Sequence, residues 1–385
     1  MKWTNKGHEF DSVYENIKNK STYYLFGAGE YGEAIYDLIK DELNIAGFID
    51  NSKGKQNSGY LGLPVVALED IDCKEETVGI IITVSPDTRL TIMQQLIIKG
   101  FVQNQDIFTM EIFMSVYQAY ANNKVYFSSI SFLPSTRCNL NCETCLNFTP
   151  FMRSFDERPW EQIKADVDKF FDCADYIMLF HISGGEPLLY PKIAELIEYI
   201  DVNYGNRIRF LRTVTNGTVL PKPELLERLS KFRIEITVDD YREAVPESAG
   251  TFNKLLELLK QYKIKYEVNK ADQWIDLAPM TTHHESWSEQ RLCKQFEGCH
   301  VPWQELREGK LYSCNYDSYA VVAGIIEEDE TDTFDLKKYF KAQTKELMEF
   351  RLGYNTKGNV ELCKRCSGYI DVNPNKVVPA KQMLR

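Results

Sequence analysis

Short apolar runs and helix-like patterns alternate along residues 128–268, and this alternation limits the fold more than any other feature. Tyr176 to Ile182 has the length and apolar content of a buried strand, and Lys192 to Val202 then places apolar residues at helical spacing. Strands that alternate with helices run parallel and are joined by right-handed crossovers, in an open sheet or a barrel. We therefore expect an α/β fold. The expected strands are 128–133, 176–182, 207–214, 232–238 and 264–268, and the expected helices are 160–171, 192–202, 223–229 and 251–262.

A shorter series of the same kind comes first, and we expect a small Rossmann-like domain, with its lead and linker, in residues 1–115. A strand at 23–26 runs into Gly27-Ala28-Gly29-Glu30-Tyr31-Gly32, which opens a helix, and a strand at 45–49 ends at Asp50. Gly27, Gly29 and Gly32 would let a diphosphate approach the helix N-terminus, and Asp50 would meet ribose hydroxyls. The domain has the length of one mononucleotide-binding half. It either holds a nucleotide or nucleotide-sugar or is a degenerate scaffold.

Composition argues against several classes of partner. The 385 residues carry a net charge of −11, whereas nucleic acids and anionic membranes are bound by clustered Lys and Arg. No stretch approaches the roughly 20 apolar residues that span a bilayer, and no apolar signal-peptide core follows the first residues. We expect a cytoplasmic protein with a small-molecule or protein substrate. In a reducing compartment its ten cysteines are better candidates for metal ligands than for disulfides.

Three of these cysteines, Cys138, Cys142 and Cys145, have the spacing Cys-x3-Cys-x2-Cys. Thiolates at this spacing fit one face of a cubane iron–sulfur cluster, because neighbouring iron atoms each need a sulfur. Three ligands leave one iron open. Zinc is the alternative, although it usually takes four protein ligands or includes His, and no His lies in this segment.

Further motifs follow the strands of the long series. Ser183-Gly184-Gly185-Glu186-Pro187 follows the second strand, Thr215-Asn216-Gly217 follows the third, and Asp239 ends the fourth. With the three cysteines, these motifs resemble the radical S-adenosylmethionine (SAM) superfamily over about residues 128–270. The resemblance implies a partial (β/α)6 barrel, expected in residues 116–288, with a [4Fe–4S] cluster on the cysteines and SAM bound by these motifs. It also implies that SAM is cleaved to a 5′-deoxyadenosyl radical, which takes hydrogen from a substrate.

The other cysteines are concentrated near the C-terminal end. Cys299, Gly309, Cys314 and the pair Cys363 and Cys366 resemble the auxiliary-cluster region of the SPASM and twitch subfamilies. A full SPASM region needs seven cysteines for two clusters, and this one has five with Cys293. The resemblance therefore implies a twitch-like region with one auxiliary [4Fe–4S] cluster, with a zinc knuckle as the alternative. We expect this region in residues 289–370 and a loosely ordered tail in residues 371–385.

The region should contain a hairpin strand at 310–313, after a turn at Gly309, that brings Cys314 back beside Cys299. Cys293 is the extra cysteine. It would replace Cys363 or Cys366 as a ligand, or be a free thiol that donates a hydrogen atom. We expect His283, His284 and His300 to be solvated or structural rather than ligands, and the tryptophans 274, 287 and 303 to serve packing.

The leading functional hypothesis is a radical SAM oxidoreductase or epimerase. Its expected substrate is a carbohydrate, either a sugar or a nucleotide-sugar, and its expected electron donor is a flavodoxin- or ferredoxin-type protein. Residues 24–32 and 47–51 resemble the small Rossmann-like domains of nucleotide-sugar acetyltransferases, which favours a nucleotide-linked sugar. Asp239 and Glu267 are candidate bases for oxidation, and Cys293 is the candidate hydrogen donor for epimerisation. The alternatives are a maturase of a ribosomal peptide and a non-catalytic iron–sulfur electron carrier or nucleotide sensor.

Overall fold

A computed structural model describes residues 1–270, 274–299 and 303–383. Its contacts divide the chain into two compact units. One unit consists of residues 5–126 with 344–348, and the other of residues 1–4, 127–343 and 349–385. Within the described ranges, no helix is long and apolar enough to cross a membrane.

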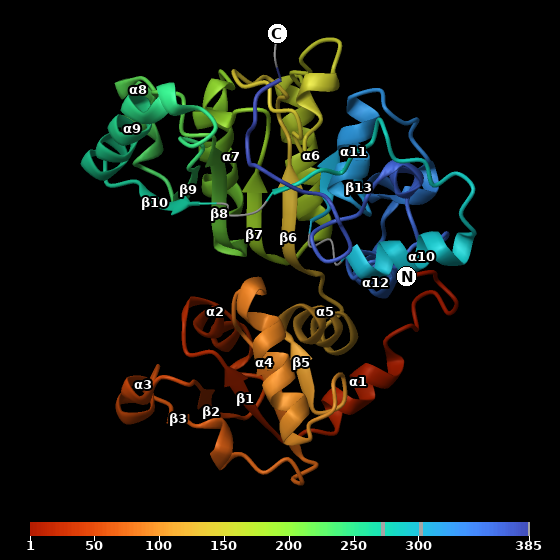
Figure 1. Cartoon of the computed structure of the whole chain (residues 1–385). Coiled ribbons are helices and arrows are strands. Elements are labelled where there is room, and N and C mark those ends of the chain that lie inside the picture. Colours follow the sequence, from red (N-terminus) through yellow and green to blue (C-terminus); the bar gives the residue numbers. More distant parts are fainter. Residues whose placement is uncertain (271–273, 300–302, 384–385) are drawn as a thin grey trace. The chain divides into compact units, whose positions relative to one another are not determined.

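The first unit is a five-stranded parallel sheet flanked by helices (Figure 1). The strand order β3-β2-β1-β4-β5 is that of a doubly wound sheet, so the predicted Rossmann-like fold is confirmed. All five residues of β4 are buried, as expected for a central parallel strand. The strands are β1 Thr22–Phe26, β2 Ile45–Ile49, β3 Val65–Val66, β4 Val78–Ile82 and β5 Ile107–Thr109, and the helices are α1 Asp11–Lys18, α2 Glu30–Ile39, α3 Lys53–Ser58, α4 Pro86–Lys99 and α5 Met110–Ala121.

The second unit contains an eight-stranded sheet in the order β10-β9-β8-β7-β6-β12-β13-β14 (Figure 1). Its strands β6 to β10 alternate with helices α6 to α9 along the chain, which confirms the predicted α/β fold with an open, partial barrel. The strands are β6 Tyr126–Phe132, β7 Tyr176–Ile182, β8 Ile208–Thr215, β9 Ile234–Asp239 and β10 Lys265–Asn269, and the helices are α6 Trp160–Cys173, α7 Ile193–Tyr204, α8 Pro223–Leu229 and α9 Ala249–Gln261.

Residues after 270 add the three short strands β12, β13 and β14 to this sheet, and they also form helices and a separate two-stranded sheet of β11 and β15. Strand β12 pairs in parallel with β6, through Glu305 and Ser131. Strand β13 then pairs antiparallel with β12, and β14 pairs antiparallel with β13. Within the described residues, three helices form after residue 288, and in α10 the buried residues Leu292, Phe296 and Cys299 recur at helical spacing. The elements are β11 Trp274–Ile275, α10 Glu289–Cys299, β12 Glu305–Arg307, β13 Lys310–Tyr312, α11 Asn315–Val322, β14 Thr333–Asp335, α12 Thr344–Arg351 and β15 Lys376–Val377.

The two faces of the main sheet differ in chemistry. Phe180 of β7 is fully buried and packs against Phe170 and Phe171 of α6. Its neighbour His181 points to the opposite face, because successive strand residues alternate in direction. His181 is paired in register with Arg212 of β8, and Arg212 with Glu235 of β9. The face away from the helices therefore carries a row of ionisable side chains.

The prediction of a loosely ordered tail is wrong for residues 371–383. Strand β15 pairs with β11, and the Asn373 side chain donates to the carbonyl oxygens of Gly368 and Asp276. Gln382 forms a β-bridge with Cys142. The sequence could not show this order, because every one of these partners but Gly368 lies about a hundred or more residues away along the chain.

A buried carboxyl joins β12 to β6 and gives a testable pH dependence. Glu305 accepts hydrogen bonds from the Leu133 amide at 2.9 Å and the Tyr319 hydroxyl at 3.2 Å. Burial raises its pKa from the usual 4.5 to about 7. Between these two values the folded protein binds the proton that the unfolded chain releases, so this group makes stability fall as pH rises from about 4.5 to 7.

The Glu305→Gln variant should lose this component of the pH dependence. We expect the wild type to lose more unfolding free energy than the variant between pH 5 and pH 8, by up to a few kcal/mol. Urea unfolding at the two pH values measures the difference. Parallel curves for wild type and variant would contradict the assignment.

Candidate functional site

Three of the predicted ligands lie on the loop between β6 and α6, and we call residues 138–145 the cysteine loop. Burial raises the pKa of Cys138 to about 12, and the nearby thiols of Cys142 and Cys145 add to the rise. The loop is closed by a hydrogen bond from the Cys145 amide to the Cys142 carbonyl at 3.3 Å. The thiols of Cys142 and Cys145 are thus near enough to Cys138 for their charges to change its pKa.

Each sulfur of the cysteine loop also has a hydrogen-bond donor. The donors are Asn216 Nδ2 at 3.9 Å from Cys138 Sγ, Gln382 Nε2 at 3.3 Å from Cys142 Sγ, and backbone N–H groups of residues 147–149 for Cys145. Donors of this kind stabilise the negative charge of cluster-bound sulfur. The surroundings of the loop therefore fit an iron–sulfur cluster with three protein ligands.

Backbone hydrogen bonds join the motif after β7, residues 184–187, to the segment that leads into the cysteine loop. The Gly185 amide donates to the Ser135 carbonyl at 3.1 Å, and the Glu186 amide donates to the Arg137 carbonyl at 2.7 Å. A Cβ atom on Gly185 would stand 2.4 Å from the carbonyl oxygens of both Thr136 and Arg137. Only glycine allows this approach. The motif thereby fixes the entry to the loop.

Glu186 joins this motif to the turn after β8. Its carboxylate is 2% exposed and accepts the Asn216 amide at 2.8 Å and the Leu188 amide at 3.1 Å. Burial raises the Glu186 pKa to about 7. The Asn216 side chain in turn donates to the Asn139 side chain at 3.0 Å. The predicted motifs at 184–187 and 215–216 and the cysteine loop thus meet at one edge of the sheet.

The candidate bases Asp239 and Glu267 both have partners. Asp239 accepts the Tyr241 hydroxyl at 2.9 Å and the Asn269 amide at 2.7 Å, and burial raises its pKa. Glu267 accepts the Thr237 hydroxyl at 3.0 Å and pairs with Arg212 at 3.3 Å. The two carboxylates extend from neighbouring parallel strands, β9 and β10.

Sequence reasoning missed His181 on the same face of the sheet. Among the described residues, its Nδ1 atom is buried and has no hydrogen-bond partner. Burial and, to a smaller extent, the Arg212 charge lower the His181 pKa to about 4, so the ring is neutral at neutral pH. The signal in the sequence was a single histidine in an otherwise apolar strand.

Four cysteines of the C-terminal region line one small chamber, which we call the auxiliary chamber. Cys299 ends α10, Cys314 follows the β12–β13 hairpin, and Cys363 and Cys366 lie in and just after a short 3-10 turn. The predicted hairpin after the Gly309 turn is confirmed. The amides of Gly368 and Tyr369 donate to the Cys366 and Cys299 sulfurs at 3.3 and 3.4 Å. The rest of the lining is largely apolar: Leu277, Gln295, Phe296, Tyr316, Val360, Leu362 and Tyr369.

Cys293 does not line the auxiliary chamber. It precedes Cys299 by six residues, which places the two side chains about 120° apart around α10. Its thiol donates to the Lys357 carbonyl at 3.2 Å and accepts from the Asn359 side chain at 3.7 Å. The geometry separates Cys293 from the other four cysteines.

No three His, Cys, Asp or Glu side chains of the described ranges are gathered as a site for a single metal ion. The ligands of a four-iron cluster each bind a different iron atom, so they surround a volume rather than a point. The auxiliary chamber, with four thiols in its wall, has this arrangement.

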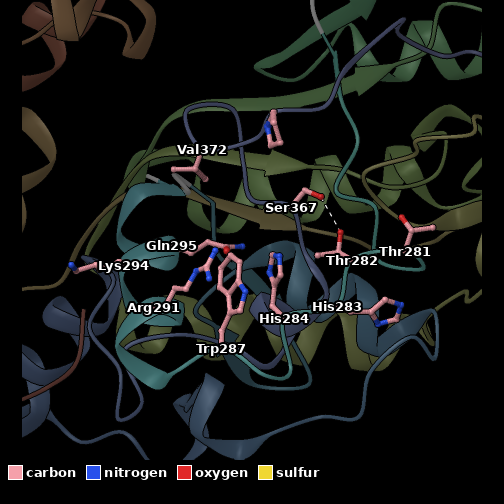
Figure 2. Close-up of a pocket in the computed structure, with 11 residues that line it drawn as sticks. Thr281, Thr282, His283, His284, Trp287, Arg291, Lys294, Gln295, Ser367 and Val372 are labelled. Carbon is pink, nitrogen blue, oxygen red and sulfur yellow. Dashed lines mark hydrogen bonds between the residues drawn. The ribbon is translucent and has the colours of Figure 1, made fainter.

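A larger cavity, of about 640 Å³, is lined by residues of α10, by the segment before it and by Ser367 (Figure 2). The Trp287 ring stacks on His284 at 3.5 Å, and the Arg291 guanidinium lies 3.6 Å from the same ring. Figure 2 shows Trp287 between the other two side chains. His284 Nδ1 is 3.3 Å from the Cys363 carbonyl, and Gln295 donates to the Cys366 carbonyl at 2.7 Å.

These contacts bear on the predicted roles of the histidines and tryptophans. His283 and His284 both line the cavity, and the His284 ring also contacts the auxiliary region at the Cys363 carbonyl. Trp287 lines the cavity in addition to packing, whereas Trp274 donates to the Thr144 carbonyl at 3.0 Å, beside the cysteine loop. His300 lies outside the described residues.

In the first unit, the glycine loop after β1 has the predicted form. Gly27 has a φ of +123°, and a Cβ atom there would meet the Thr83 carbonyl oxygen at 2.6 Å. A Cβ atom on Gly32 would meet the Gly27 carbonyl oxygen at 2.1 Å, whereas one on Gly29 would meet nothing within 4 Å. Gly27 and Gly32 are thus required by packing within the unit, and the space beside Gly29 is open.

Asp50 is held within the same loop. Its carboxylate accepts the Ala28 amide at 3.1 Å, the Ser52 amide at 2.9 Å and the Lys55 ammonium at 2.9 Å. Burial raises the Asp50 pKa, but these three donors outweigh it and hold the pKa below its usual value. Asp50 therefore fastens the end of β2 to the glycine loop.

The three glycines should differ in the effect of alanine. We expect Gly32→Ala to lower the unfolding free energy by about 3 kcal/mol or more, because its Cβ atom would clash with backbone. Gly29→Ala should leave stability nearly unchanged. Thermal unfolding of the two variants measures this, and equal losses would contradict the geometry.

Comparisons with known proteins match two separate regions of the chain. The sequence profile of the Radical SAM superfamily matches residues 132–270, and that of the PglD N-terminal domain matches residues 23–96. A PqqA peptide cyclase of Gluconobacter oxydans is 29% identical over 117 residues, 30% of this chain and 31% of that protein. A GTP 3′,8-cyclase of Microcystis aeruginosa is 28% identical over 138 residues, 35% of this chain and 39% of that protein.

The chain spans about a third of the length of these curated relatives. The solved structure of anSMEcpe with bound AdoMet aligns with 59% of this chain and 80% of that chain, at 14% identity and a TM-score of 0.41. The N-terminal domain, residues 23–96, is of the PglD type. The cysteine loop and its two neighbouring motifs lie at one edge of the sheet, and together with the profile match they identify residues 132–270 as a radical SAM domain, whose cofactors are a [4Fe–4S] cluster and SAM.

Proposed function

We propose that this radical SAM enzyme takes hydrogen from a carbohydrate or nucleotide-linked sugar and oxidises or epimerises it. The observation that carries the proposal is the auxiliary chamber. Its four thiols would bind all four iron atoms of a cluster and leave none for a substrate. A closed cluster suits electron transfer. The N-terminal domain matches the PglD N-terminal domain. Its residues 24–32 and 47–51 also resemble nucleotide-sugar acetyltransferase domains, which supports a nucleotide-bearing substrate.

The proposed function uses two cofactor sites, one for the first cluster together with SAM and one for the auxiliary cluster. Cys138, Cys142 and Cys145 would hold the first cluster, and Gly184-Gly185-Glu186-Pro187 with Thr215 and Asn216 would hold SAM, beside Asp239. When bound, these cofactors supply a hydrogen-abstracting radical, and an auxiliary [4Fe–4S] cluster supplies a one-electron acceptor. A flavodoxin- or ferredoxin-type protein is the proposed electron donor.

Oxidation of an alcohol also needs an acceptor for the hydroxyl proton. Asp239 and Glu267 are candidates. However, Asp239 already accepts a hydrogen bond, and Glu267 accepts a hydrogen bond and also forms an ion pair. We add His181, whose neutral ring has a buried nitrogen without a partner in the described chain. The base is the residue whose replacement (His181→Gln, Asp239→Asn or Glu267→Gln) slows product formation while SAM binding is retained.

Oxidation is favoured over epimerisation by the position of Cys293. Epimerisation needs a thiol that returns hydrogen to the substrate carbon, and the Cys293 thiol is engaged by Lys357 and Asn359 in the auxiliary region. A Cys293→Ser variant should therefore keep full activity if the enzyme oxidises its substrate. Loss of the epimerised product, while 5′-deoxyadenosine still forms, would favour epimerisation.

The test uses reconstituted protein, SAM, a chemical reductant and a panel of nucleotide-sugars under anaerobic conditions. Mass spectrometry of the products should show 5′-deoxyadenosine together with a ketone lacking two hydrogens. Deuterium in a product of otherwise unchanged mass, formed in D2O, would indicate epimerisation. Formation of 5′-deoxyadenosine without any change in the sugars would argue against a sugar substrate.

Modification of a ribosomal peptide is the second candidate. The match of 117 residues to a PqqA peptide cyclase favours it. A peptide encoded beside the gene and altered by the enzyme would support this function. Tight binding of a nucleoside diphosphate to the full chain, weakened by Gly29→Val, would support the sugar function instead.

A further inference from the structure

Residues 380–383, which we call the cap segment, lie along the cysteine loop and pair with it through an isolated antiparallel β-bridge. The Glu143 amide donates to the Lys381 carbonyl at 2.7 Å, and the Met383 amide donates to the Asn141 carbonyl at 2.8 Å. The bridge between Cys142 and Gln382 lies between these two bonds. The backbone of the loop is therefore paired on the side of Cys142.

The Gln382 side chain adds a second set of contacts. Its Oε1 atom accepts the Asn141 amide at 2.7 Å, and its Nε2 atom donates to the Cys142 sulfur at 3.3 Å and to the Ala380 carbonyl at 2.6 Å. One side chain thus satisfies a loop amide and a thiol with opposite ends of the same amide group. Ala380 itself is 2% exposed, so the cap segment is anchored in the unit.

We propose that Gln382 is a positioning residue of the SAM-side site, which fixes Cys142 and sets the reduction potential of the cluster that Cys142 would hold. An N–H group aimed at a cysteine sulfur stabilises the reduced, more negative state of a cluster and so raises its potential. The inference rests on the proposed ligand role of Cys142. It does not depend on which substrate the enzyme uses.

The chain offers variants that separate the two contacts. Gln382→Met removes both the donor and the acceptor without adding charge. Gln382→Glu keeps an oxygen for the Asn141 amide but cannot donate to the sulfur. Lys381→Gln is the matched control, because it removes only the ion pair with Glu143, at 3.0 Å, from the same segment.

The readout is the midpoint potential of the cluster whose electron paramagnetic resonance signal changes when SAM is added, measured in full-length reconstituted protein. We expect a more negative potential in both Gln382 variants and no shift in Lys381→Gln. A shift in Gln382→Glu without one in Gln382→Met would be an effect of charge and would overturn the proposal. Unchanged potentials in both Gln382 variants would also overturn it.

The same titration separates this inference from the proposed function. A potential that shifts as expected in a protein that leaves every nucleotide-sugar unchanged would support Gln382 while removing the sugar substrate. Iron counts accompany each sample. An unshifted potential with full iron content would leave Gln382 only a structural role and overturn the inference.

Discussion

The double variant Cys314→Ala/Cys366→Ala should lose about half of its iron after anaerobic reconstitution, because the structure places both thiols in the wall of one auxiliary chamber. The SAM-responsive signal of the other cluster should remain, since its three ligands lie on the cysteine loop. Iron analysis and electron paramagnetic resonance measure the two effects.

Cys293→Ala is the matched control for this experiment. The Cys293 thiol lies outside the chamber, against Lys357 and Asn359, so its loss should leave the iron content unchanged. A loss of iron equal to that of the double variant would mean that Cys293 is a ligand after all. A full iron count in the double variant would remove the auxiliary cluster, and with it the basis of the oxidation proposal.

Gly185→Ala should abolish SAM binding and lower the unfolding free energy of the radical SAM domain by about 3 kcal/mol or more. The added Cβ atom would stand 2.4 Å from two backbone oxygens that cannot move without displacing the start of the cysteine loop. Urea unfolding and calorimetric titration with SAM measure the two losses.

Gly250→Ala provides the control in the same domain. Gly250 lies in the first turn of α9, and an added Cβ atom would meet nothing within 4 Å. Alanine there should raise stability by about 0.5–1 kcal/mol, since glycine is a poor helix former. If Gly185→Ala were as stable as Gly250→Ala, the close approach of the motif to the loop would be wrong.

The parts of the site that sequence could predict are those set by periodicity and local spacing. Parallel strands bring their C-terminal ends to one edge of the sheet. The motifs at 184–187 and 215–216, which follow two of these strands, were therefore expected to meet near the cysteine loop. The hairpin between Cys299 and Cys314 followed in the same way from a glycine turn. These predictions needed no knowledge of distant contacts.

Other features depended on contacts that no local pattern records. Whether Cys293 joins the other four thiols is decided by the helical phase of α10, a mostly polar helix whose buried residues are Leu292, Phe296 and Cys299. The role of Gln382 depends on a partner 240 residues earlier in the chain. The unpartnered nitrogen of His181 becomes evident only once its neighbours are placed.

The pairing of the cap segment with the cysteine loop has a consequence for how the site is assembled during synthesis. Cys142 and Gln382 are separated by 240 residues, so at about 5–20 residues per second the ribosome completes the cysteine loop roughly 10–50 s before its cap exists. During that interval the loop lacks both its backbone pairing with residues 381–383 and the Gln382 donor to the Cys142 sulfur. The final geometry of the cysteine loop is therefore reached only after the last residues of the domain have been made.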